Sequence, residues 1–322
     1  MNSKKFTIAI AFILFGLMGV VFLSLWILPE EKYMQGEYGA WKQQKDYATC
    51  KHDENEIVLL GDSRMKIGLS ARDLSDNTYN LSLAGSNPMD MYYTLKRYLN
   101  AGNSPEKVFI GVAPTHLTFY ENYTDRGLFF HYYDDAEIAE INAKILWYEG
   151  VDYSREVYKY KFRSPSVYLT ALLHSLKEDR EQKNKSLYDS LCNNKGTLNL
   201  SGVKDDGSAV IPEECKEQDF KLKKLLDYYL CETIDMCKER NIPVYIIQLP
   251  MGVKGVDILK STGYMDTYEA YMQSVADRTG AEVEVKIPTY KDEYFADNSH
   301  LNVEGQKKYT GEIRQKYGLE ME

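Results

Sequence analysis

Three side chains have the types and the spacing that acyl-ester chemistry needs. Ser63 follows the apolar run Ile57–Leu60 and a Gly-Asp pair, and His300 lies three residues after Asp297. A serine hydroxyl is a poor nucleophile until a base takes its proton, and that base is usually an imidazole held by a carboxylate. One loop is short enough to carry both Asp297 and His300. The pattern therefore predicts Ser63 as a nucleophile, His300 as its base and Asp297 as the acid that orients the base.

Each of these residues also has an ordinary structural interpretation. Gly-Asp-Ser at residues 61–63 is typical of turns, and Asp62 is expected to hydrogen-bond its own loop. A single histidine is more often a helix-capping or surface residue. Of the five histidines, only His300 stands beside a well-placed carboxylate in a turn. Thr115 and His116, just past another apolar run, are the further candidates for contact with a substrate.

Five apolar or alternating runs predict the strands that position these side chains. Continuous apolar runs fit strands buried on both faces of a parallel sheet, whereas strict alternation fits an edge strand with one wet face. The predicted strands are Ile57–Leu60, Tyr79–Leu83, Lys107–Ala113, Val244–Leu249 and the alternating edge strand Ala281–Ile287. Ser63 then lies at the carboxyl-end rim, where open α/β sheets bind their ligands.

Helical segments are predicted between these strands. They run from Pro88 to Gly102, from Glu217 to Arg240, from Thr267 to Thr279, and from the N-cap Asn302 to Tyr317. The alternation predicts an α/β fold with three layers, α/β/α, in which helices cover both faces of a mostly parallel five-stranded sheet. Residues 117–216 do not continue this alternation of strands and helices. They predict a largely helical insertion after the third strand, on the rim that carries Ser63.

The N-terminal segment predicts the compartment. Residues 6–28 contain no charged side chain, and a helix of that length crosses a hydrocarbon core of about 30 Å. Lysines before the run and acidic residues after it predict a cytoplasmic tail at 1–5, a transmembrane anchor at 6–28, a stalk at 29–55 and an extracytoplasmic domain at 56–322. A cleaved signal sequence is the alternative, although no small-residue cleavage site ends the run. Either interpretation predicts that Ser63 works outside the cytoplasmic membrane.

Composition argues against two classes of function. The 322-residue chain has a net charge of −9, whereas nucleic-acid binding needs a basic face to neutralise phosphates. The five cysteines show no CxxC spacing, so no zinc site and no other metal is expected. A disulfide between Cys192 and Cys215 would close a loop, but the odd number of cysteines favours buried thiols.

Four blocks of this sequence resemble the SGNH (GDSL-like) hydrolase superfamily. The blocks are Gly61-Asp62-Ser63 after a strand, Asn80 to Gly85, the GVAPTH stretch that ends at His116, and Asp297-x-x-His300-Leu301-Asn302. The resemblance covers Glu56 to Tyr317, interrupted by the insertion. It is strongest with the membrane-anchored cell-envelope branch, which includes D-alanyl-transfer proteins and acyltransferases that modify alginate, peptidoglycan and other surface polymers.

The resemblance implies an oxyanion hole in which two donors are assigned and the residue that supplies a third is not identified. The backbone N–H groups of Ser63 and Gly85 would stabilise the tetrahedral intermediate by several kcal/mol. The third block of the family often carries an Asn donor, but that place reads GVAPTH here. Arg64, Asn87 and Thr115 are candidates to replace the Asn, and nothing in the sequence chooses among them. The same departure is found in the envelope acyltransferase branch.

The implied function is that of a membrane-anchored, extracytoplasmic serine acyltransferase. It would pass an acetyl or D-alanyl group through an ester on Ser63 to hydroxyls of a cell-envelope polysaccharide or teichoic-acid-like polymer. By the resemblance, a membrane-bound O-acyltransferase would supply the acyl group, and no cofactor is required. Two alternatives stay open: an esterase that removes such groups with the same residues, and a non-catalytic, membrane-tethered assembly subunit on a degenerate SGNH fold.

Overall fold

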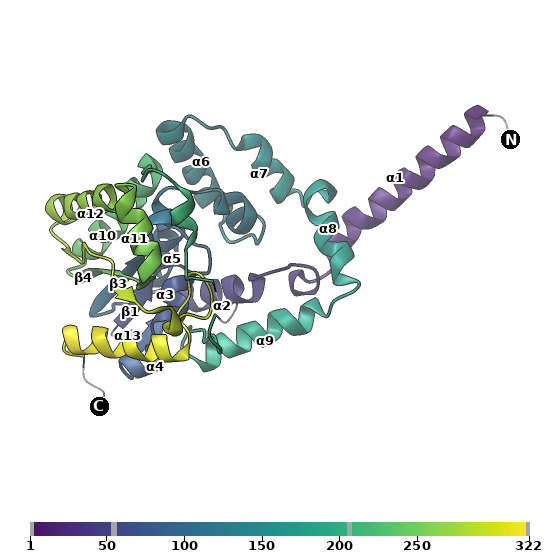
Figure 1. Cartoon of the computed structure of the whole chain (residues 1–322). Helices are drawn as coiled ribbons and strands as arrows, with labels where there is room; N and C mark the ends of the chain where they lie inside the picture. The colour runs from purple at the N-terminus through teal and green to yellow at the C-terminus, as the bar shows by residue number, and fades with distance from the viewer. Residues whose placement is uncertain (1–2, 53–56, 205–207, 320–322) are drawn as a thin grey trace. The chain divides into compact units, whose positions relative to one another are not determined.

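Short apolar strands form one parallel sheet. The computed structural model describes residues 3–52, 57–204 and 208–319. The strands of the sheet are β1 (Ile57–Leu60), β2 (Thr78–Asn80), β3 (Lys107–Val112), β4 (Val244–Gln248) and β6 (Glu282–Val283). Their order is β2-β1-β3-β4-β6, and every neighbouring pair is parallel (Figure 1). The α/β class and the five-stranded parallel sheet predicted from the sequence are therefore confirmed.

The edge strand is much shorter than the sequence pattern predicts. Only Glu282–Val283 of the predicted strand Ala281–Ile287 pairs in the ladder with β4. The Gln248 side chain donates a hydrogen bond to the Glu284 carbonyl (2.9 Å). The Glu284 carbonyl, which would accept the next backbone hydrogen bond from β4, is therefore taken by the Gln248 side chain. The segment after Val283 then leaves the sheet. It pairs again as β7 (Thr289–Tyr290) with β5 (Met251–Gly252) in a separate two-stranded sheet.

Three other predicted strands also end early. The strand predicted at Tyr79–Leu83 stops at Asn80, because the Asn80 side chain accepts the Ser82 N–H (3.0 Å) and turns the chain. The third and fourth strands each stop one residue before the predicted end, at Val112 and Gln248. Strand ends are therefore the part that periodicity predicts least well, because local side-chain bonds decide them.

Helices make up most of the remaining chain. In chain order they are α1 (Ser3–Ile27), α2 (Tyr38–Ala48), α3 (Ser63–Gly68), α4 (Ala71–Leu74), α5 (Pro88–Asn100), α6 (Asp135–Glu149), α7 (Ser154–Lys161), α8 (Pro165–Ser175), α9 (Arg180–Asn193), α10 (Lys224–Lys238), α11 (Val253–Ser261), α12 (Tyr264–Thr279) and α13 (Val303–Lys316). The segment between β3 and β4 contains α6 to α10. Asn87 caps α5 and Asn302 caps α13, and the second of these caps was predicted.

The helix predicted at Glu217–Arg240 begins later, as α10 at Lys224. Phe220 is buried, and its ring packs against three tyrosine rings of α12 with centroid distances of 5.3 to 5.7 Å. The Lys223 N–H donates to a backbone carbonyl at the end of the 114–117 turn (2.9 Å). Burial of this aromatic ring overrides the helical pattern of residues 217–223, because tertiary packing outweighs propensity.

Residues 38–48, expected within a polar stalk, form α2. Trp41 is fully buried, and its indole Nε1–H donates to the Ala84 carbonyl (3.1 Å). Gln44 is also buried and donates to the Asn80 carbonyl (2.8 Å). This helix therefore packs against the loops that follow β2, whereas a stalk would be solvated. Residues 53–56 lie outside the described residues.

The chain divides into two compact units. One unit contains Met1–Gly39 and Tyr123–Tyr188, and the other contains Ala40–Asn122 and Asp189–Glu322. The first, called the helical unit below, includes α1 and α6 to α8. The second, called the sheet unit below, includes the whole five-stranded sheet. The domain boundaries predicted at residues 5, 28, 55 and about 117–216 stay predictions.

The N-terminal helix is long and apolar. The segment Lys4–Ile27 is the one helix among the described residues with the length and hydropathy to cross a membrane. Such a helix fits a membrane anchor and also a signal sequence. All five cysteines are described and are free thiols, so the bridge considered for Cys192 and Cys215 is absent.

Candidate active site

Ser63 is the first residue of α3 and follows β1 through a tight turn. Asp62 caps the helix, because its Oδ1 accepts the backbone N–H groups of Arg64 (2.8 Å) and Met65 (3.2 Å). Gly61 is needed before the cap, since a Cβ there would lie 2.4 Å from the Met65 Cβ. The turn leaves Ser63 partly accessible at the carboxyl end of β1, while Asp62 is fully buried.

The loop before α13 is built around Asp297. Its Oδ1 accepts the backbone N–H groups of Ser299 (2.7 Å) and His300 (2.8 Å). The Ala296 N–H donates to the His300 carbonyl (2.9 Å), which closes the loop at its base. These bonds, with the contact of the ring to Asp297, orient the His300 ring within its own loop.

Asn302 joins this loop to the last helix. Its Oδ1 accepts the Gly305 N–H (2.9 Å), and its Nδ2 donates to the Glu293 carbonyl (2.8 Å). The helix that follows packs on the sheet through Tyr309 and Ile313, which belong to the same buried cluster as residues of β1, β3 and β4. The core therefore holds the His300 loop at the edge of the sheet that carries Ser63.

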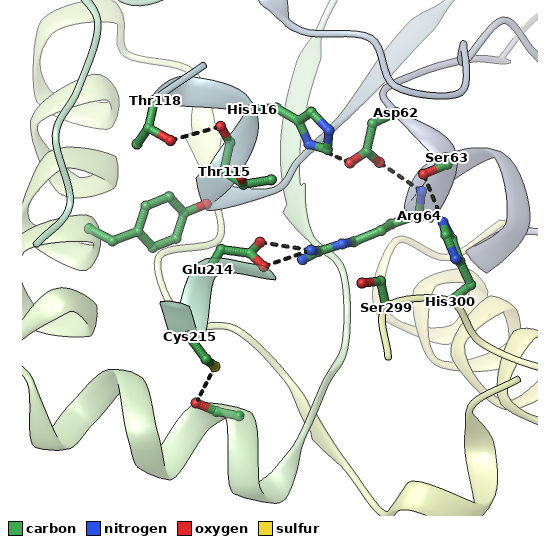
Figure 2. Close-up of polar contacts among 12 residues, drawn as sticks. Asp62, Ser63, Arg64, Thr115, His116, Thr118, Glu214, Cys215, Ser299 and His300 are labelled. Carbon is green, nitrogen blue, oxygen red and sulfur yellow. Dashed lines mark hydrogen bonds and ion pairs between the residues drawn. The ribbon is translucent and has the colours of Figure 1, made fainter. Parts of the chain in front are cut away.

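The structure brings together the three residues that the sequence singled out. The Ser63 Oγ lies 2.8 Å from the His300 Nε2, and the His300 Nδ1 lies 2.8 Å from the Asp297 Oδ2 (Figure 2 shows the first pair). With the imidazole proton assigned to Nδ1, where the carboxylate accepts it, Nε2 is free to accept the serine proton. This arrangement can activate a hydroxyl for attack on a carbonyl carbon.

The Asp297 carboxylate is charged at neutral pH. Partial burial alone would raise its pKa, but the bonds from His300 and from the backbone N–H groups outweigh burial and lower the pKa to about 2. The side chain is 51% exposed and that of His300 is 22% exposed. A charged carboxylate beside Nδ1 is the partner that an imidazolium needs.

Ser63 and Gly85, the two residues predicted to supply oxyanion donors, are linked through Gly61. Gly85 adopts the left-handed φ of +69°, and its turn is tied to the strand end because the Leu83 N–H (3.0 Å) and the Ser86 hydroxyl (2.7 Å) both donate to the Gly61 carbonyl. Within the described part of the chain, no protein acceptor takes the N–H of Ser63 or of Gly85. Both groups are therefore available to a ligand.

Two of the three candidates for the missing donor are held by other groups. The Arg64 Nη2 lies 2.8 Å from both carboxylate oxygens of Glu214, and this ion pair is buried (Figure 2). The Asn87 Nδ2 donates to the Asn122 Oδ1 (2.6 Å), and the Asn87 Oδ1 accepts the Met89 N–H (3.0 Å). Their side chains thus serve the packing around the site.

Thr115 and His116 lie in the short 3-10 turn Pro114–Leu117 that follows β3. The Thr115 carbonyl accepts the Thr118 hydroxyl (2.9 Å). The His116 Nδ1 lies 2.6 Å from the Asp62 Oδ2, so this histidine contacts the residue that precedes Ser63 (Figure 2). His116 therefore adjoins the site through Asp62.

Glu214 is the residue of this site that sequence reasoning missed. It lies in the 3-10 turn Glu213–Lys216, within a polar stretch of the predicted insertion. It is 150 residues from Arg64 in the chain and is fully buried. No local pattern marks it, because adjacent glutamates in a polar loop are ordinarily solvated.

Acid should destabilise the sheet unit through Asp62. Burial alone would raise the pKa of this carboxyl, but His116 and Arg64 reverse the effect and lower it to about 2 from 3.8. A depressed pKa stabilises the fold above the unfolded value, so about 2 kcal/mol is lost as pH falls from about 4 to 2. We expect Asp62→Asn, which keeps the capping oxygen, to flatten the dependence of unfolding free energy on pH in that window. An unchanged slope in this variant contradicts the assignment.

Loss of the Asn302 cap should weaken the loop that carries His300. Asn302→Ala removes the acceptor for Gly305 and the donor to Glu293, and we expect a loss of about 1 to 2 kcal/mol in unfolding free energy. Urea titration followed by circular dichroism measures the loss. Ser299→Ala in the same loop is the matched control, because only the backbone N–H of Ser299 bonds Asp297, and such positions change stability by about 0.5 kcal/mol or less. Equal losses in the two variants count against the cap.

No protein-family model matches this chain, and no curated protein matches its sequence.

Proposed function

We propose that this protein is a serine acyltransferase of the SGNH type, with a three-layer α/β/α sheet unit. Ser63 is the nucleophile, His300 the base and Asp297 the residue that orients the base. The observation that carries the proposal is the chain of two 2.8 Å contacts from Ser63 through His300 to Asp297. Ser63 and His300 are 237 residues apart, and such a contact between a hydroxyl and a carboxylate-bound imidazole is typical of acyl-transfer sites.

The reaction has two balanced halves. The Ser63 Oγ attacks the acyl carbonyl while the His300 Nε2 takes the hydroxyl proton, and the oxyanion accepts the N–H groups of Ser63 and Gly85. The His300 proton then passes to the leaving oxygen, which leaves an ester on Ser63. In the second half an acceptor hydroxyl gives its proton to His300 and attacks this ester. The acyl group moves to the acceptor and Ser63 recovers its proton.

The proposed place of action is the outer face of a membrane. The support is the N-terminal apolar helix with Lys4 and Lys5 before it and acidic residues after it, because positive charge favours the cytoplasmic side. Activated acyl donors such as acyl-CoA are cytoplasmic, so an extracytoplasmic serine needs a relay. A membrane-bound O-acyltransferase is the proposed donor. The proposed acceptors are hydroxyls of an envelope glycan or teichoic-acid-like polymer, and the acyl group is acetyl or D-alanyl.

An esterase is the second candidate function. The partial exposure of His300 and Asp297 favours it, because water that reaches the base can replace a glycan hydroxyl as the acceptor. The purified full chain in detergent, given p-nitrophenyl acetate with and without a glycan acceptor, separates the two. Acetylated glycan formed faster than acetate supports transfer, whereas acetate alone supports the esterase. Release of p-nitrophenol no faster than by the Ser63→Ala protein counts against both and favours a non-catalytic subunit.

Replacement of Asp297 by asparagine should slow both halves of the reaction. The amide can donate to Nδ1 and so favours the wrong imidazole tautomer, which costs about 10²- to 10⁴-fold in turnover. Release of p-nitrophenol measures the change. Asp292→Asn, in the turn before the same loop, is the control and should keep wild-type turnover. An Asp297→Asn enzyme with wild-type turnover removes this residue from the proposed mechanism.

A further inference from the structure

The corner between α7 and α8 of the helical unit carries exposed apolar side chains beside the end of α1. We propose that this corner, defined by Tyr158, Phe162 and Arg163, rests on the outer surface of the lipid bilayer. The inference relies on one part of the proposed function, namely that α1 is a membrane anchor. It does not depend on the chemistry of Ser63.

Arg163 fixes the corner to the last turn of α1. Its Nη1 donates to the Leu25 carbonyl (2.7 Å), and its guanidinium carbon lies 5.1 Å from the centre of the Trp26 ring. Its Nη2 donates to the Glu30 carboxylate (2.5 Å), just beyond the helix. In Figure 1 the end of α1 meets α8. These contacts hold the corner at one fixed level along the anchor.

That level coincides with the membrane boundary. The apolar segment Lys4–Ile27 has 24 residues, which at about 1.5 Å each span about 36 Å, slightly more than a hydrocarbon core of about 30 Å. The outer boundary therefore lies within about one helical turn of Trp26, a residue type enriched at this boundary. Phe162 precedes Arg163, so its backbone is about 3.8 Å from a residue that contacts the anchor directly.

The exposed side chains at this corner are of the kind that enters a lipid interface. Tyr158 is 63% and Phe162 is 52% exposed, and their rings stack with centroids 6.0 Å apart. Large apolar side chains gathered in this way cost free energy in water. Insertion into the headgroup region removes that cost.

The charge of the corner also suits a lipid surface. Residues 155–163 contain four basic side chains and one acidic side chain. Two of the basic side chains pair with carboxylates outside this stretch, Lys161 with Asp135 and Arg163 with Glu30, so four positive and three negative charges leave a net charge of +1. Basic side chains around aromatic ones are typical of interfacial helices on anionic lipids. We therefore assign the corner to lipid headgroups.

Tryptophan depth measurements on the full chain in nanodiscs test the inference. Trp26 and Trp147 are replaced by phenylalanine, and Trp41 remains as a fully buried background. Phe162→Trp then reports on the corner. Nanodiscs of phosphatidylcholine and phosphatidylglycerol, with and without brominated acyl chains, quench an indole within the lipid, and iodide quenches one in water. We expect brominated lipid to remove most of the emission that Phe162→Trp adds, and iodide to have little effect on it.

Three further proteins make the outcome decisive. Glu156→Trp, on the opposite side of α7, should be quenched by iodide and not by brominated lipid. Tyr158→Trp is a second reporter, expected to behave as Phe162→Trp does, if the first variant folds poorly, because Tyr158 stacks on Phe162. The native Trp26, measured in Trp147→Phe, reports whether α1 is inserted.

The patterns of quenching separate the inference from the anchor it relies on. The inference is overturned, while the anchor stands, if brominated lipid quenches Trp26 and iodide quenches both Phe162→Trp and Tyr158→Trp. Protection of the Phe162→Trp indole from both quenchers indicates a second copy on this surface and also overturns it. Equal lipid quenching of Glu156→Trp and Phe162→Trp overturns the proposed orientation. None of these results bears on whether Ser63 can be acylated.

Discussion

Replacement of Ser63 by alanine is expected to lower the rate of p-nitrophenyl acetate turnover by about 10⁴-fold or more. The hydroxyl is the only group in the proposed mechanism that forms a covalent bond to the acyl carbon. The oxyanion donors at residues 63 and 85 are backbone N–H groups, so they survive this substitution. Residual turnover should therefore stay above the rate in buffer, and a fluorophosphonate probe should no longer label the chain.

Ser299 provides the matched control for this experiment. It lies beside His300 in Figure 2, and only its backbone N–H bonds Asp297. Ser299→Ala should therefore keep both turnover and labelling. If Ser63→Ala still reacts with the probe at the wild-type rate, the nucleophile assignment is wrong. Loss of labelling in Ser299→Ala as well, with a normal circular dichroism spectrum, points to a disturbed loop.

Removal of the Glu214 carboxylate is expected to be the most destabilising single change at the site. Burial alone would raise the pKa of Glu214, but the Arg64 guanidinium outweighs burial and lowers it. The two side chains are 0% and 7% exposed. Glu214→Ala leaves Arg64 charged and buried without a partner, which costs about 3 to 5 kcal/mol. Urea unfolding followed by circular dichroism should show this loss.

A double variant separates the ion pair from simple packing. Arg64→Met with Glu214→Leu removes both charges and keeps most of the volume, so it should recover much of the stability lost in Glu214→Ala. Glu214→Gln keeps the shape but not the charge, and we expect it to be intermediate. If Glu214→Ala lowers the unfolding free energy by less than about 1 kcal/mol, the buried ion pair does not have the proposed role, because a loss of that size is typical of exposed surface ion pairs.

The fold was predictable where sequence patterns act over a few residues. The β1 run needs only continuous apolar side chains between turn residues, and the predicted bounds Ile57–Leu60 are those of the strand. The Asn302 cap is equally local, because its acceptor lies on the first turn of α13. The prediction failed at residues 217–223, where Phe220 packs into a distant aromatic cluster. A helical period carries no information about such a partner.

The sequence by itself determined the local chemistry of this protein. It determined that Asp62 bonds its own loop and that Asp297 and His300 share one loop, because backbone and side-chain bonds over two or three residues suffice for both. It also determined that the chain begins with a long apolar helix.

Only the tertiary structure decided which residues meet across the sheet. The 2.8 Å contact between Ser63 and His300 depends on how α13 packs against β1, β3 and β4, since no local bond spans 237 residues. The same packing holds Arg64 against Glu214 and Asn87 against Asn122, and these are two of the three side chains that were candidates for the missing oxyanion donor. Contacts between distant segments depend on the close packing of complementary buried surfaces. The pattern of apolar and polar residues along the sequence does not specify which surfaces are complementary.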